Sequence, residues 1–498
     1  MVMNHRIRSC FLVFAFSLAG LLTRAGFGAE RPNIVFIMTD DHAAYAVSGS
    51  ARLPGIQSPG FDRLKAEGTA FRNAFVTTSL CSPSRATALT GLYAHRSGVP
   101  INQSRQDPDE SVPLVSELLQ KEGYTTAFIG KWHMKDTDTP RRGFDYWYAF
   151  EGQGRYNDPV MNENGTRSEV PGYTTDILTD RAIAWMREHG DEGPFCLFLW
   201  HKAPHGPFEP AERHRDLYDD LPIPAPPNWG DTFVDKPAHY RRAAEWGNVH
   251  KFWKGSEGKP IPDSVPPKRP WVSQGRDGRL EMIRSYLECQ QAVDEGLERI
   301  LDALDETGLA NETLVIYTSD NGMNLFAHHF TYDKRTAWEE SIRVPLVMRW
   351  PGQVPAGAER EEFALNVDFV PTFLELAGAE PPEYLQGRSL VPLLRGESVP
   401  AWRDSMLYLY FAERFAPGFP TVLAVRDERY KYIHLPEDEE DFDELYDLQT
   451  DPYELKNLFG DPAYAEVRER MRARLREHLR KAGYDKAAPQ LGYAPPSK

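Results

Sequence analysis

Two apolar runs in this chain end abruptly at carboxylates. Residues 33–39 read NIVFIMT before Asp40, and residues 313–319 read TLVIYTS before Asp320. Both runs are short, rich in β-branched residues and unalternating, which is typical of strands buried on both faces of a parallel sheet. Between the two runs, further strands are expected at 125–130 and 195–200, another follows at 344–349, and helices are expected at 113–122, 175–188 and 280–309. This alternation predicts a doubly wound α/β domain.

The pattern changes around residues 378–404, where prolines mark a boundary. Beyond it the sequence predicts three short strands and an amphipathic helix, at 405–411, 421–426, 430–434 and 463–482. We therefore expect a main α/β domain over residues 30–385. Residues 386–498 should form a smaller domain with an antiparallel sheet and a terminal helix.

Residues 206–279 lack this regularity and are rich in Pro, Trp, His and Gly. A connection this long inside a compact domain is usually functional or disordered. Its aromatic content favours an ordered wall of a pocket, so we expect the segment to face a substrate.

The first 29 residues look like a secretory signal, with a basic stretch, an apolar run at 11–22 and small residues near position 28. The apolar run is too short to cross a bilayer. We expect an exported protein, periplasmic or secreted, without a membrane span. Removing this segment deletes three arginines and no acid, so the net charge of −16 becomes −19. Such a charge argues against nucleic acid as a partner.

Three cysteines remain once Cys10 leaves with the signal segment. Cys196 lies in an apolar strand pattern and Cys289 in a helical one, so both are expected to be buried thiols, as free cysteines often are. Cys81 has no such setting. An unpaired cysteine in an exported protein invites a chemical explanation.

Four polar side chains directly follow the two central strands: Asp40, Asp41, Asp320 and Asn321. Open α/β sheets bind ligands outside the carboxyl ends of their strands, so we expect these residues at one site. Three carboxylates and an amide are hard oxygen ligands, suited to Ca²⁺ or Mg²⁺ rather than to zinc. Each motif alone is also compatible with an ordinary turn.

Residues 80–92 read LCSPSRATALTGL. This run resembles the maturation signature of type I sulfatases, C-x-P-S-R followed by T-G, in which the cysteine is oxidised to formylglycine. The resemblance spans residues 33–457 and implies an alkaline phosphatase-like fold, a sulfate-ester hydrolase, and a formylglycine made from Cys81 by a formylglycine-generating enzyme or an equivalent. It also implies a Ca²⁺ site, with Mg²⁺ as the alternative ion, at Asp40, Asp41, Cys81, Asp320 and Asn321.

The resemblance implies roles for five further residues. Arg85, within the signature, would stabilise the hydrated aldehyde or its oxyanion. Lys131 and His133, in the run GKWH, would contact the diol and the sulfate. His205, in the run APH, would be the general acid for the leaving alcohol. Lys334, in the run DKRTAWEE, would bridge the sulfate and the leaving oxygen.

Two stretches resemble, more narrowly, the sulfatases that act on N-acetylglucosamine 6-sulfate and related glycosaminoglycan sugars. One comprises residues 142–147 and 152–156, and the other is the run DKR at 333–335 preceded by two histidines. The resemblance implies that the substrate is a sulfated carbohydrate and that its contacts include Lys131, His329, Lys334 and Arg335.

Two other functions remain open. An enzyme of the same fold could hydrolyse phosphodiesters or phosphonate esters, and relative rates on aryl sulfate and phosphodiester substrates would separate the two activities. If Cys81 is never oxidised, the protein could instead bind sulfated glycans without turnover.

Overall fold

The computed structural model describes residues 31–135, 139–241, 278–329, 333–414, 416, 418–436 and 443–484. The secretory segment expected at residues 1–29 lies outside the described residues. Among the helices of the described ranges, none is both long and apolar enough to cross a membrane.

A ten-stranded sheet organises the larger part of the fold, in the order β11-β2-β10-β9-β1-β8-β4-β5-β6-β7. Five neighbouring central strands run parallel: β9 (Thr313–Ser319), β1 (Asn33–Thr39), β8 (Phe195–Trp200), β4 (Thr125–Lys131) and β5 (Tyr146–Phe150). The four central strands expected from their apolar runs are therefore confirmed. The outer strands are β2 (Thr69–Phe71), β6 (Val160–Glu163), β7 (Thr166–Glu169), β10 (Val347–Arg349) and β11 (Ala358–Arg360).

The strand expected at 344–349 differs from the prediction in length and direction. It begins only at Val347, because Pro345 has no N–H to donate to a ladder. It runs antiparallel to β9, with Val347 opposite Tyr317. Because β10 is antiparallel to its neighbour β9, it starts at the edge of the sheet where β9 ends.

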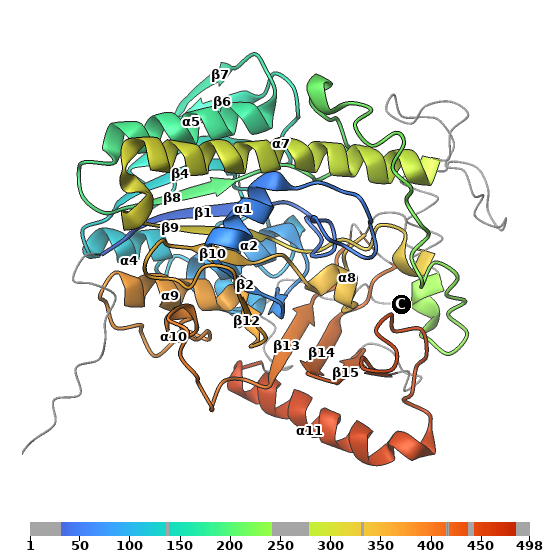
Figure 1. The fold of residues 1–498 in the computed structure, drawn as a ribbon. Coiled ribbons are helices and arrows are strands. Elements are labelled where there is room, and N and C mark those ends of the chain that lie inside the picture. The colour runs from blue at the N-terminus through green and yellow to red at the C-terminus, as the bar shows by residue number, and fades with distance from the viewer. Residues whose placement is uncertain are drawn as a thin grey trace, which may run out of the picture. The chain divides into compact units, whose positions relative to one another are not determined.

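Helices cover both faces of this sheet (Figure 1). One face carries α1 (Pro59–Glu67), α5 (Thr174–His189) and α7 (Gly278–Thr307), and α7 contacts both of the others. The other carries α2 (Cys81–Thr90), α4 (Val115–Lys121) and α9 (Phe369–Leu376). The expected helices correspond to α4, α5 and α7.

The remaining short elements connect these layers. They are β3 (Ala74–Phe75), β12 (Ala364–Leu365), α3 (Ala94–Ser97), α8 (Glu339–Ile342), α10 (Val391–Leu394) and the 3-10 helices η1 (Asn102–Ser104), η2 (Glu212–His214), η3 (Leu309–Glu312), η4 (Ala327–His329), η5 (Asn366–Asp368) and η6 (Pro462–Tyr464).

The central strand β1 shows why these runs lack polar alternation. Val35 and Ile37 join the buried apolar cluster that includes α5 and α7. Phe36 points to the opposite face, with its ring centroid 4.9 Å from Phe369 and 5.4 Å from Phe373 of α9. Because successive side chains of a strand face opposite sides, a strand covered on both sides must be apolar throughout.

A second sheet follows near the C-terminus. It is antiparallel and consists of β13 (Ser405–Tyr410), β14 (Val422–Asp427), β15 (Tyr430–His434) and β16 (Glu444–Asp447). The helix α11 (Ala465–Lys481) buries Met471 and Leu475 against it. The antiparallel sheet and terminal helix are thus confirmed. The strand β16 is not predicted by the sequence pattern, because two of its four residues are acidic and it lies in a stretch rich in acids.

The described part of the segment 206–279 comprises residues 206–241 and the first two residues of α7, and residues 242–277 lie outside the description. The amide of Asn228 donates to Glu340 Oε1 at 2.8 Å. Asp231 pairs with the ring of His328 at 2.6 Å. These contacts attach the segment to the region around Lys334.

Candidate active site

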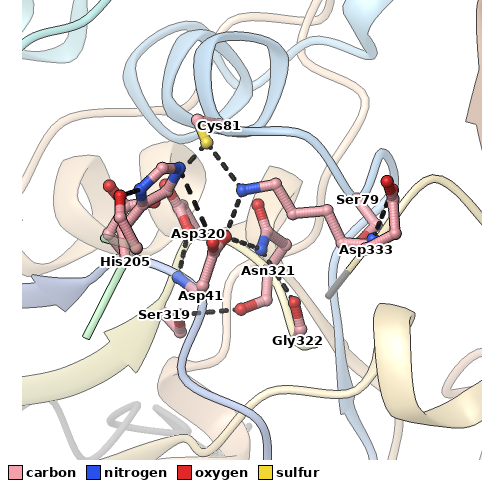
Figure 2. Close-up of polar contacts among 12 residues, drawn as sticks. Asp41, Ser79, Cys81, His205, Ser319, Asp320, Asn321, Gly322 and Asp333 are labelled. Carbon is pink, nitrogen blue, oxygen red and sulfur yellow. Dashed lines mark hydrogen bonds and ion pairs between the residues drawn. The ribbon is translucent and has the colours of Figure 1, made fainter. Parts of the chain in front are cut away.

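The carboxyl ends of the central strands bring the expected site residues together. Pairing of Thr39 with Ser319 aligns the ends of β1 and β9, and β8 ends beside them. Cys81, at the start of α2, faces this edge (Figure 2). The other residues at the edge are Asp40 and Asp41 after β1, Asp320 and Asn321 after β9, Lys131 at the end of β4 and His205 after β8. Segments far apart in sequence thus form one buried polar cluster.

Cys81 is fully buried. Its thiol donates a weak hydrogen bond to Asp40 Oδ1 at 3.5 Å, and the ammonium of Lys334 lies 2.8 Å from its sulfur. Burial, with a further contribution from the charge of Asp40, raises the pKa of the thiol to about 12. The unmodified side chain is therefore protonated at neutral pH and is a poor nucleophile.

Side chains of the cluster offer a set of donor atoms to a cation. Oxygens of Asp40 and Asp41, the sulfur of Cys81 and a ring nitrogen of His205 lie within 4.8 Å of one another. Asn321 lies beside them, and its amide nitrogen donates to Asp41 Oδ1 at 2.7 Å. Its Oδ1 is buried and accepts no hydrogen bond from the described residues. Two carboxylates next to a buried amide oxygen without a donor fit a hard divalent cation.

Asp320 is placed differently from the other residues expected to bind the metal. Its Oδ1 accepts a hydrogen bond from the backbone N–H of Asp41 at 3.1 Å, and its Oδ2 pairs with Arg85 at 2.8 Å. Burial, together with repulsion from Asp40, raises the pKa of its carboxyl to about 7. The structure therefore brings Asp320 to the metal-binding edge, with its carboxylate held by Arg85.

Buried cations balance these carboxylates. Lys131 pairs with Asp40, Lys334 with Asp41, and Arg85 with Asp320 and, at 3.8 Å, with Asp40. Burial by itself would raise the pKa of Asp40, but the charges of Lys131, Arg85 and Lys334 outweigh it and hold the pKa well below its usual value. Asp40 therefore stays ionised, as a ligand for a cation requires.

Two histidines, His205 and His133, lie near Cys81 and Ser82 at the start of α2. The ring Nδ1 of His205 lies 2.5 Å from the carbonyl of Gly206, which can only accept, so Nδ1 carries the proton. Its Nε2 lies 3.7 Å from Asp41 Oδ2. The ring of His133 lies 3.4 Å from the hydroxyl of Ser82. Burial lowers the pKa of both histidines well below 6.5, so both rings are neutral in the free protein.

A pocket of about 820 Å³ opens over this cluster. The expected site residues that line it are Asp41, Cys81, His133, His205, Lys334 and Arg335. Its lining includes no residue of the described segment 206–241. The expectation that this segment forms the substrate-facing wall is therefore wrong for its described part, because its contacts direct it to His328 and the C-terminal sheet instead.

Two residues of the pocket lining, Gln153 and Glu413, were assigned no role from the sequence. Arg335 donates from Nε to Glu413 Oε2 at 2.8 Å, and Glu413 follows β13. The ammonium of Lys131 donates to Gln153 Oε1. No local motif connects these partners, since the contacts join positions distant in sequence. His329, expected to contact substrate, lies outside the residues whose side chains the structure describes.

Comparison with known protein families identifies the chain. Residues 32–379 match the family model described as Sulfatase. The chain belongs to the sulfatase family. It is therefore an enzyme that hydrolyses sulfate esters, as the signature around Cys81 indicated. Residues 327–481 of this sulfatase also match the model described as N-sulphoglucosamine sulphohydrolase, C-terminal, which covers both Lys334 and Glu413.

Individual relatives agree with this assignment. The sulfatase is 34% identical to the N-acetylglucosamine-6-O-sulfatase of Bacteroides thetaiotaomicron, over 93% of this chain and 89% of that protein. It matches a structure solved in complex with D-glucosamine-2-N,6-O-disulfate with a TM-score of 0.81 and 32% identity, over 93% of this chain and 99% of the other. A phosphonate monoester hydrolase from Silicibacter pomeroyi shares the fold, with a TM-score of 0.72 and 24% identity over 91% of this chain and 96% of that one. The alkaline phosphatase-like fold class is confirmed.

Proposed function

We propose that this sulfatase removes sulfate from a sulfated carbohydrate, glycosaminoglycan-like or another sulfated polysaccharide or oligosaccharide. The observation that carries the proposal is the position of Cys81, which lines the pocket, belongs to the donor cluster and contacts Lys334. The carbohydrate is supported by the similarity to an N-acetylglucosamine-6-O-sulfatase over 93% of this chain.

The nucleophile and the cation supply the chemistry that the unmodified chain lacks. Oxidised to formylglycine, residue 81 would offer two hydroxyls of a hydrated aldehyde, one to attack sulfur and the other, once deprotonated, to expel sulfate. A divalent cation, Ca²⁺ or Mg²⁺, would polarise the sulfate oxygens. Asp40, Asp41 and Asn321 would hold it together with residue 81, and Asp320 lies next to them.

The remaining residues would position groups and move protons. Lys334, 2.8 Å from the sulfur of residue 81, would hold the sulfate and the leaving oxygen. His205 would give a proton to the departing alcohol. Because its ring is neutral in the free protein, His205 must take up this proton when the anionic ester binds. His133 would take a proton from the nucleophile. The positive charges of Arg85 and Lys131 would balance the negative charge that the nucleophile then carries.

We also infer that the protein is exported and matured by a formylglycine-generating enzyme or an equivalent. The signal-like pattern of residues 1–29 supports export. Since Cys81 is fully buried, the oxidation must precede complete folding. We retain the division into residues 30–385 and 386–498, with Glu413 as the contribution of the second part to the pocket.

Mass spectrometry of the tryptic peptide 73–85 tests the nucleophile directly. Protein made with a formylglycine-generating enzyme should carry the aldehyde or its hydrate at residue 81 and should release sulfate from a sulfated sugar. Cys81→Ala should abolish release, whereas Cys196→Ala, a change at a buried thiol of β8, should retain it. Full activity of Cys81→Ala would refute the mechanism.

The same preparations distinguish the two alternatives. Faster hydrolysis of a phosphodiester or phosphonate ester than of any sulfate ester would favour the phosphonate hydrolase. A thiol that persists at residue 81 despite the maturation enzyme, with sulfated glycans bound but not cleaved, would favour a binding protein.

A further inference from the structure

We propose that Arg105 binds a second anionic group of the substrate, a sulfate or a carboxylate apart from the ester that is cleaved. The sulfatase would thereby prefer glycans that carry another negative charge near the scissile sulfate. This inference rests on the proposed function and adds a class of substrate to it. It is carried by the charges that line the pocket and by the turn that holds Arg105.

The pocket is larger than its sulfate-binding floor needs. Its volume of about 820 Å³ lies in the upper part of the range that holds whole ligands. Cys81, His205 and Lys334 line the region around the reacting ester. Arg105, which directly follows η1, lines the same pocket and is exposed, so a substrate bound there can contact its side chain.

A comparison of charges singles out Arg105. Each acidic residue that lines the pocket already has a cationic partner: Asp41 pairs with Lys334, Asp333 and Glu413 with Arg335, and Glu151 with Arg167. Within the described ranges, Arg105 has no hydrogen bond, ion pair or ring contact. Lys135 also lines the pocket, but it borders the undescribed residues 136–138. A guanidinium without a carboxylate offers its donors to an anion from outside.

The turn that carries Arg105 is fixed relative to the nucleophile. The backbone N–H of Ser82 donates to Asn102 Oδ1 at 2.9 Å, and the N–H of Asn102 donates to Glu413 Oε1 at 3.1 Å. Glu413 in turn holds Arg335. Arg105 closes this turn in the left-handed region, at φ 44° and ψ 42°, which is uncommon for a residue with a side chain. Asn102, at the start of the turn, is thus bonded both to α2 through Ser82 and to Glu413.

The negative charge of the whole chain would oppose binding of an anionic substrate, and a cation at the pocket would counter that repulsion. A formal net charge of −16 repels a polyanion, but screening confines that repulsion to about 8 Å at physiological salt. An exposed cation at the pocket offsets it where the substrate binds. Its contribution should fall as the salt concentration rises.

The test compares kcat/KM on three sugars: one with a single sulfate, the same sugar with two sulfates, and the monosulfated sugar joined to a uronic acid. For Arg105→Gln, we expect the ratio of kcat/KM on a doubly anionic sugar to that on the monosulfated one to fall about fivefold, through KM. The sugar whose ratio falls identifies sulfate or carboxylate as the second group. At 0.5 M salt the difference between wild type and variant should shrink.

A matched control is Arg476→Gln, which removes the same charge from an exposed arginine of α11 outside the pocket lining. It should leave the ratio unchanged. If Arg105→Gln leaves both ratios unchanged, or if Arg476→Gln lowers them equally, Arg105 is not a specificity residue and the proposed sulfatase function still stands. If the matured wild type cleaves none of the three sugars, the proposed function and the role of Arg105 are both refuted.

Discussion

Gly130 is the position at which one methyl group tests the geometry beneath the site. It precedes Lys131 on β4 and has φ +120°. A Cβ built there lies 1.9 Å from the carbonyl oxygen of Trp200, on the neighbouring strand β8. The substitution Gly130→Ala therefore places a methyl group against backbone that cannot rotate away.

The expected cost has two parts. A side chain at this backbone conformation costs roughly 1–3 kcal/mol. To restore an ordinary contact of 3.4 Å, β4 and β8 must separate by about 1.5 Å, and overpacking of a close-packed interior costs roughly 1–3 kcal/mol more. We expect Gly130→Ala to lower the free energy of unfolding by roughly 2–6 kcal/mol, a large fraction of a typical total of about 5–15 kcal/mol.

Urea unfolding followed by circular dichroism measures this cost. The matched control is Gly308→Ala, since Gly308 has φ +77° and no atom within 4 Å of its built Cβ. That variant should lose only about 1–2 kcal/mol, from backbone conformation alone. The same strand movement displaces Lys131, so kcat/KM of the folded Gly130→Ala protein should also fall. Equal losses in the two variants would refute the close approach of β4 and β8.

Three further predictions concern the ion, pH and the buried ion pairs. Chelation should abolish turnover and lower the unfolding midpoint, and added Ca²⁺ or Mg²⁺ should restore both; unchanged activity after chelation would exclude the metal site. Burial and neighbouring acids raise the pKa of Glu288 from 4.5 to about 7, so the stability it confers is complete below about pH 4.5 and is lost as the pH rises through 7. In urea titrations, the free energy of unfolding of Glu288→Gln should therefore rise by about 1–2 kcal/mol relative to that of the wild type between pH 5 and pH 8. A difference between the two proteins that does not change with pH would contradict the raised pKa. Asp231→Asn removes the carboxylate that His328 and Lys236 share in the interior and should lower the free energy of unfolding by about 3–5 kcal/mol in the same assay. The control Asp302→Asn, at the exposed pair with Arg63, should cost less than about 1 kcal/mol. Similar losses in the two variants would place Asp231 in solvent.

The central strands and the edge that carries the site could be predicted because their signals are local. A strand buried on both faces must be apolar throughout, as Phe36 and its neighbours show, and the run ends where the chain leaves the sheet. The carboxyl ends of parallel strands share one edge, so Asp40 and Asp320 had to lie close together. The short run of residues around Cys81 was enough to indicate the family.

Contacts between distant segments left no such trace. The direction of β10 depends on which edge the preceding chain occupies, and the path of residues 206–241 depends on the pairing of Asp231 with His328. Neither the direction of β10 nor the path of residues 206–241 is encoded in the hydrophobic pattern of the segment itself. Tertiary packing alone therefore determined which of the expected elements border the pocket.

The sequence by itself determined the α/β fold class, the family and the residue types gathered at the strand ends, because apolar runs and short motifs act over neighbouring positions. Only the tertiary structure decided that Asp320 is held by Arg85, that Glu413 reaches Arg335 from beyond β13, and that Arg105 lines the pocket without a partner in the described ranges. The physical reason is that charge pairing and burial depend on distances in space, which the order of residues along the chain does not specify.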